Sequence, residues 1–155
     1  MALGPHHATW KALYDALGAL ATACGGSFAF VVDEGNGLWC VGVPALAPTT
    51  VTPHADEAAD RFYRAEIVPR MTTMTRGHKF EVVRSFVDVN VSSDHYFAQS
   101  FANIYALVVW FESVFDVKKT REAVQRSLPR IEALVLELPP SGPGGAGEGR
   151  ASQRA

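Results

Sequence analysis

The strongest constraint on the fold is an uninterrupted apolar run at residues 104–111, which reads Ile-Tyr-Ala-Leu-Val-Val-Trp-Phe. The run contains no charged residue, and its β-branched and aromatic residues favour a strand over a helix. A strand with one face in water alternates polar and apolar side chains, and this run does not alternate. We therefore expect a central strand of a sheet that is covered by helices on both faces.

The composition is that of one folded domain. The chain has 155 residues, of which 48% are hydrophobic and 19% charged, with a formal net charge of −2. This near-neutral net charge does not indicate nucleic-acid binding, and the longest apolar run is too short to span a bilayer. The N-terminus lacks the basic and apolar regions of a signal peptide. We expect a cytoplasmic protein in which Cys24 and Cys40 are reduced core residues.

Apolar periodicity and turn residues predict the order helix, two strands, helix, three strands, helix. The first helix is expected over residues 8–24, with Trp10, Leu13, Leu17, Leu20 and Cys24 on its buried face. The other elements are expected as strands over residues 27–33 and 38–43, a helix over 55–76, strands over 79–91, 95–101 and 104–111, and a helix from Asp116 to Leu138.

Short hairpins join the strands that follow each helix, so the predicted fold class is α+β, with a mostly antiparallel five-stranded sheet. One helix would lie on one face of the sheet and two on the other. Pro69 is expected to make the middle helix kink or restart near Ile67, because proline cannot donate to the carbonyl four residues back. Residues 8–138 would form the domain, between a flexible N-terminus at 1–7 and a disordered Gly/Pro-rich tail at 139–155.

No set of residues has the spacing of a catalytic or cofactor site. Ser93, Asp94 and His95 are consecutive, so their side chains point apart and cannot relay a proton through one another. His78 and His95 lack carboxylate or thiol neighbours at metal-ligand spacing. We therefore expect a protein that is not an enzyme, with no catalytic residue, no metal site and no cofactor.

The middle helix and the strand after it predict a protein interface. Six basic residues between Arg61 and Arg84 flank an apolar face that carries aromatic and methionine side chains. An ordinary solvated helix face is the alternative reading of this pattern. The candidate dimer or partner interface consists of Arg61, Phe62, Tyr63, Arg64, Ile67, Arg70, Met71, Met74, Phe80 and Val82.

The element order and several local runs resemble the roadblock/dynein-light-chain family, and most closely its bacterial MglB-type branch. The resemblance covers residues 8–138, and three stretches carry it: the run Gly-Gly-Ser-Phe-Ala-Phe-Val-Val-Asp at 25–33, the strand at 106–111, and Phe115-Asp116 before the last helix. The proline-rich loop at 44–53, Pro69 and the C-terminal tail depart from the family pattern.

The resemblance implies a homodimer in which the middle helix and the neighbouring edge strand pack against their mates. It also implies a platform for a small Ras-like GTPase, or for a roadblock paralogue, in bacterial cell polarity and gliding motility. Members of the MglB branch promote GTP hydrolysis by positioning the GTPase's own groups. A protein of this kind would act as a GTPase activator without catalytic residues of its own.

A secretion-chaperone-like or YbjN-like protein-binding module is the competing interpretation. That fold also places helices on an antiparallel sheet and forms dimers. Its usual order has three strands before the middle helix and two after it, whereas the pattern here predicts two before and three after. The order of elements along the chain therefore separates the two interpretations.

Overall fold

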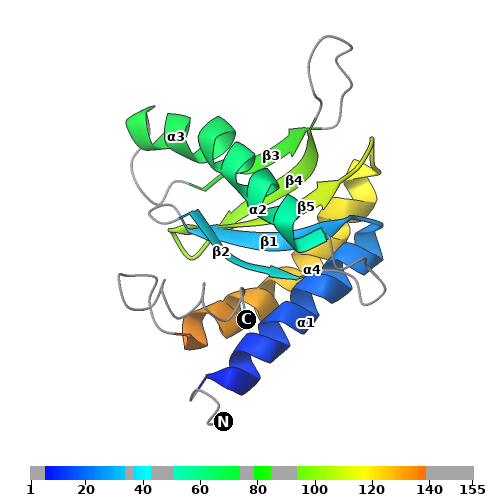
Figure 1. Cartoon of the computed structure of the whole chain (residues 1–155), viewed down its shortest axis with the longest axis vertical. Coiled ribbons are helices and arrows are strands. Elements are labelled where there is room, and N and C mark those ends of the chain that lie inside the picture. Colours follow the sequence, from blue (N-terminus) through cyan, green and yellow to red (C-terminus); the bar gives the residue numbers. More distant parts are fainter. Residues whose placement is uncertain (1–5, 34–36, 43–50, 74–78, 85–93, 139–155) are drawn as a thin grey trace.

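The structure, a computed structural model, describes residues 6–33, 37–42, 51–73, 79–84 and 94–138 (Figure 1). The N-terminus expected to be flexible, residues 1–7, lies mostly outside these ranges, and the expected disordered tail at 139–155 lies wholly outside them. Its elements are helix α1 (His7–Cys24), strands β1 (Phe28–Asp33) and β2 (Gly37–Gly42), the helical segments α2 (Val51–Phe62), η1 (Tyr63–Ile67) and α3 (Val68–Thr73), strands β3 (Glu81–Arg84), β4 (His95–Phe101) and β5 (Tyr105–Phe111), and helix α4 (Val117–Glu137).

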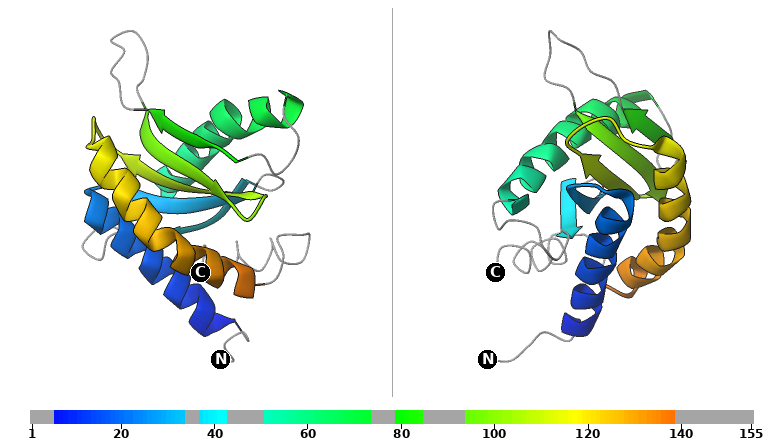
Figure 2. Two further views of the ribbon diagram at one scale, coloured as in Figure 1. Left: turned by 180° about the vertical axis from the view of Figure 1, so that it is seen from behind. Right: turned by 90° about the vertical axis from the view of Figure 1, so that its right-hand side faces the viewer.

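The five strands form one antiparallel sheet in the order β2-β1-β5-β4-β3. Strand β5 lies in the middle, as its uninterrupted apolar run predicts, and β2 and β3 form the two edges. Helices α1 and α4 pack side by side on one face of the sheet, and α2 crosses the other face (Figures 1 and 2). The predicted α+β class, with one helix opposite two, is confirmed.

Strand β5 divides the core into two halves. Leu107 and Val109 pack in the cluster that includes the buried faces of α1 and α4. Ala106, Val108 and Trp110 pack in the cluster beneath α2. Every residue of β5 is buried, because successive side chains point to opposite faces of the sheet and helices cover both faces.

The two long helices begin and end where local chemistry indicates. Helix α1 buries the five predicted apolar residues and stops at Gly25, whose φ of 72° suits a glycine at a left-handed C-terminal cap. Helix α4 begins after Asp116, whose side chain accepts a 3.0 Å hydrogen bond from the Lys119 backbone N–H. Pro129 lies inside α4, which is assigned as one helix through Glu137.

The middle helix begins earlier than its sequence pattern indicates. It starts at Val51 rather than near Ala55. Pro53 is compatible with this start, because a backbone N–H in the first turn would have no helical partner. Asp56 and Glu57 therefore lie beyond the first turn. The expected strand over residues 79–91 is described only as β3, and residues 85–93 lie outside the described ranges.

Candidate functional site

The middle helix changes its winding just before Pro69. Segment η1 is a π-helix, in which the Val68 backbone N–H donates to the Tyr63 carbonyl five residues back. Pro69 is the second residue of α3 and has no backbone N–H, so the regular helical hydrogen bond to the carbonyl four residues back cannot form there. The sequence predicts a kink or a restart near Ile67; in the structure the helix instead continues from η1 into α3 through a single π-helical turn. Such turns occur frequently at functional sites.

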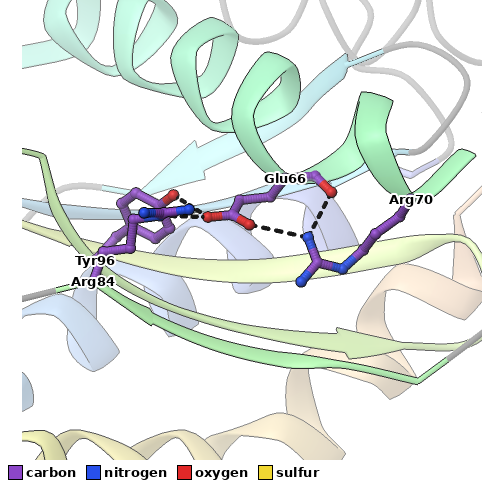
Figure 3. Close-up of polar contacts among 4 residues, drawn as sticks. All are labelled: Glu66, Arg70, Arg84 and Tyr96. Carbon is purple, nitrogen blue, oxygen red and sulfur yellow. Dashed lines mark hydrogen bonds and ion pairs between the residues drawn. The ribbon is translucent and has the colours of Figure 1, made fainter. Parts of the chain in front are cut away.

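The π-turn carries a buried carboxylate. Glu66 is only 4% exposed, and three side chains donate hydrogen bonds to it (Figure 3). The Tyr96 hydroxyl and Arg84 Nε both donate to Oε2, the latter at 2.8 Å. Arg70 Nη1 donates to Oε1 at 3.0 Å and to the Glu66 backbone carbonyl at 2.6 Å. One carboxylate thereby joins the helix to strands β3 and β4.

The hydrogen bonds keep Glu66 ionised. Burial alone would raise the pKa of its carboxyl, but the hydrogen bonds from Tyr96, Arg84 and Arg70 outweigh burial and hold that pKa below its ordinary value. Burial and the neighbouring carboxylate raise the pKa of Tyr96, so its hydroxyl remains a donor. The cluster therefore combines one negative charge, two positive charges and a neutral phenol.

The predicted interface residues divide into a buried and a surface group. Phe62 is fully buried inside its own chain, in edge-to-face contact with Tyr96 at a centroid distance of 5.3 Å. Ile67 lies in the same core cluster, against which Tyr63, Phe80 and Val82 are partly buried. The Met71 side chain and Met74 lie outside what the structure describes. Phe62 and Ile67 thus stabilise the protomer and are not presented on its surface.

The predicted arginines hold carboxylates of their own chain. Arg61 Nε lies 3.0 Å from Asp94 Oδ2, and its guanidinium lies over the Trp110 ring, 5.5 Å from the centroid. Arg64 pairs with Asp60 at 3.3 Å, and its side chain is 77% exposed. Arg70 pairs with Glu66, as described above. These three arginines are therefore paired with carboxylates rather than forming a row of unpartnered cations.

Sequence reasoning did not single out Glu66, Tyr96 or the role of Arg84. A signal was available, because Glu66 follows Phe62 by four residues and so lies on the buried side of an amphipathic helix. A carboxylate in that position needs hydrogen-bond donors. Which residues supply them depends on strands that lie 18 and 30 residues further along the chain.

The Ser93–His95 run lies only partly within the described residues, and His78 lies outside them. Asp94 pairs with Arg61, His95 is buried at the start of β4, and Ser93 lies outside the described residues. Within the described parts of the chain, no three His, Cys, Asp or Glu residues are grouped so as to hold a metal ion. No described helix is both long and apolar enough to cross a membrane.

No protein-family model matches the chain, and no curated protein matches it. Solved structures do match. The gliding protein MglB from Thermus thermophilus has a TM-score of 0.55 over 88% of this chain and 96% of its own. An MglB with a tetrameric arrangement gives 0.57 over 88% and 95%, and Myxococcus xanthus MglB gives 0.51 over 81% and 96%.

The chain has the roadblock-like fold of MglB. Sequence identity to each of the three structures is 12%, so the likeness is one of fold. The order of elements is the one predicted from the sequence, with two strands before the middle helix and three after it. This is the order that separates the MglB fold from the competing chaperone-like interpretation.

Proposed function

We propose that this protein is a non-catalytic, dimeric regulator or scaffold that binds a small Ras-like GTPase, or a roadblock paralogue that regulates one. The observation that carries the proposal is the agreement with MglB over 88% of this chain and 95–96% of two MglB chains. One of those structures is described as a gliding protein. We accordingly place the function in bacterial cell polarity and gliding motility, in the cytoplasm.

The proposed homodimer is built on the middle helix and strand β3. Strand β3 is an edge of the sheet, and edge strands present backbone groups that can pair with another chain. Val68 on α3 and Val83 on β3 are 42% and 37% exposed, among the most exposed large apolar residues described. Both belong to the segment that the sequence pattern assigns to an interface.

The proposed regulator would contribute contacts rather than chemistry. Its charged helix face, which includes Arg61, Arg64 and Arg70, would guide an acidic partner surface, with Tyr63 near the contact. Charges at the rim of an interface act mainly on the association rate, so binding is expected to weaken as salt rises. Any acceleration of GTP hydrolysis would come from ordering the partner's own groups.

Titration against the Ras-like GTPases and roadblock paralogues of the same organism tests the proposal, with each GTPase loaded with GDP or a non-hydrolysable GTP analogue. We expect binding that the double variant Arg61→Glu/Arg64→Glu weakens at least tenfold. Lys11→Glu is the matched control, because Lys11 lies on α1 on the opposite face of the sheet. Absence of binding to any of these proteins would refute the GTPase role. Equal loss in both variants would refute the assignment of this face.

A further inference from the structure

Helix α4 has a long exposed face on the side of the sheet opposite the middle helix. Figure 2 shows α4 lying beside α1, and both helices pack on the same face of the sheet. On the outward side of α4, exposed residues recur at steps of three and four, which places them in one stripe along the helix. This α4 stripe consists of Lys119, Glu122, Arg126, Pro129, Ala133 and Leu136.

The second half of the α4 stripe is apolar. Pro129, Ala133 and Leu136 are all exposed, and Leu136, at 61%, is the most exposed large apolar residue among those described. Side chains repeated at steps of three and four are spaced as a second helix needs them when it packs along the first. The shape of this half therefore suits a helical partner.

Positive charge flanks the apolar half on the side of α1. Lys119, Arg126 and Arg130 are exposed, and none of them forms an ion pair with another described residue. Burial raises the pKa of the Cys24 thiol at the end of α1, and the nearby charges of Lys119 and Arg126 oppose that rise. These cations therefore lie along the junction of the two helices, where an acidic partner would balance them.

A second copy of the chain is a poor match for the α4 stripe. Two-fold symmetry places the same surface patch against itself. A parallel pair of α4 helices would bring Lys119 and Arg126 against their own counterparts, and an antiparallel pair would bring together the flanks that carry Arg126 and Arg130. Glu137 on that flank already accepts a 3.4 Å hydrogen bond from Thr9 of its own chain.

The proposed homodimer also leaves this face free, because it uses the middle helix on the opposite face of the sheet and strand β3 at an edge. The chain's own residues 139–155 do not match the stripe either. They include no large apolar residue, and they carry one glutamate against two arginines. The occupant that fits both the shape and the charge is therefore a different protein.

We propose that the α4 stripe binds an acidic amphipathic helix of a partner protein. Leucine-like side chains of that helix would pack on Pro129, Ala133 and Leu136, and its carboxylates would accept hydrogen bonds from Arg126 and Arg130. The surface lies apart from the one assigned to the homodimer and the GTPase. The inference thus goes beyond the proposed function, and it would allow one dimer to hold two different partners at once.

The test uses the full chain and a capped peptide of about 20 residues, long enough to be helical in water. The peptide carries leucine at steps of three and four with glutamates beside it. Nuclear magnetic resonance titration should shift the Nε–Hε signals of Arg126 and Arg130. The double variant Arg126→Gln/Arg130→Gln should weaken the peptide affinity about fivefold, as expected for two exposed charge pairs. Leu136→Asp should weaken it at least tenfold, because it places a charge on the apolar contact.

The matched control is Lys11→Gln/Lys79→Gln, which removes the same charge from two exposed positions outside α4. It should change the peptide affinity less than twofold. Because all the substituted residues are exposed, circular dichroism should show that each variant keeps the fold. Equal loss in the two double variants, or equal binding of a peptide with lysines in place of the glutamates, would overturn the proposal.

Two further outcomes would overturn it. If Leu136→Asp dissociated the wild-type dimer, the occupant of the stripe would be a second copy. If the protein bound vesicles of anionic lipid but not the peptide, the occupant would be a membrane. The two proposals fail separately: dimer or GTPase binding without peptide binding refutes this inference alone, and peptide binding without either refutes the proposed function alone.

Discussion

Glu66 illustrates how a single charged residue is accommodated in the core. A buried carboxylate is unfavourable unless donors replace the water it has lost, and here Tyr96, Arg84 and Arg70 do so. The two arginines remain partly exposed, which limits the desolvation of their charges. The residue therefore joins three elements without requiring two fully buried ions.

Glu66→Gln should lower the free energy of unfolding by about 2 kcal/mol at pH 7, because the amide cannot satisfy two guanidinium groups. The pKa of Glu66 is lowered in the folded state, so its contribution is complete above the unfolded value of about 4.3. The contribution is lost as pH falls through the lower, folded value. Urea unfolding of both proteins should therefore show a difference that narrows under acid.

Glu57→Gln is the control for that experiment, since Glu57 lies exposed on the same helical stretch. It should change stability by less than about 0.5 kcal/mol at either pH. A difference between wild type and Glu66→Gln that stayed constant down to pH 3 would show that the ionised carboxylate is not what stabilises the fold.

Gly42→Ala should destabilise the protein by about 2–3 kcal/mol, because α1 lies directly against β2 at this position. A Cβ on Gly42 would lie 2.5 Å from Leu17 Cβ and 2.6 Å from both the Gly18 nitrogen and the Tyr14 carbonyl oxygen. Chemical denaturation of the variant measures the loss. An unchanged unfolding midpoint would mean that α1 and β2 can separate without penalty.

Gly25→Ala provides the comparison for Gly42→Ala. A Cβ at Gly25 would meet nothing within 4 Å, but the residue has a φ of +72°. Its substitution should therefore cost about 1 kcal/mol, from backbone strain alone. The two alanine variants thus separate steric overlap from strain.

At the scale of elements, the helices show which local signals are decisive. The α1 stop at Gly25 and the α4 start at Asp116 both satisfy terminal backbone groups, so sequence chemistry places them well. The middle helix is harder to predict, because its two prolines act differently. Pro53 lies in the first turn, where a backbone N–H has no helical partner, whereas Pro69 removes a hydrogen bond from a helix that continues past it. Proline there permits the helix to begin or to change its winding.

Asp116→Ala should destabilise the protein by about 1 kcal/mol, because the Lys119 backbone N–H loses its 3.0 Å acceptor at the start of α4. Asp116→Asn should retain most of the stability, since an amide oxygen can also cap a helix. Thermal unfolding followed by circular dichroism compares the two. Equal losses would indicate that the charge of Asp116, rather than its hydrogen bond, stabilises α4.

At the scale of the whole molecule, the protein is expected to self-associate. Sedimentation equilibrium at micromolar concentration should give the mass of two 16.8 kDa chains. Val68→Glu should weaken the dimer about tenfold if α3 lies in the interface, because it places a charge on an apolar contact. Val114→Glu is the matched control, because Val114 lies just before α4 and is 59% exposed.

A monomeric wild-type protein at high concentration would contradict the proposed dimer. Phe62→Asp does not test it, because Phe62 is fully buried in the core of its own chain. That substitution should unfold the protomer, since it buries an unpaired charge. Loss of secondary structure in the variant would distinguish unfolding from simple dissociation.

The sequence by itself determined the layers of this protein. An eight-residue apolar run predicts a strand that is covered on both faces, and helical periodicity selects the buried side of α1. These predictions succeed because burial of each side chain follows from the pattern of its neighbours along the chain. The same pattern places Phe62 on an apolar helix face but does not show what covers that face, which in the structure is the core of the same chain.

Only the tertiary structure decided which residues meet across that face. Glu66 bonds to Arg84 and Tyr96, which lie 18 and 30 residues away in sequence, and β3 becomes an edge only through the order of the strands. Local patterns fix which way a side chain points, but hydrogen-bond partners are set by distances between elements far apart in the chain. The buried carboxylate and the open edge beside it are therefore properties of the assembled fold.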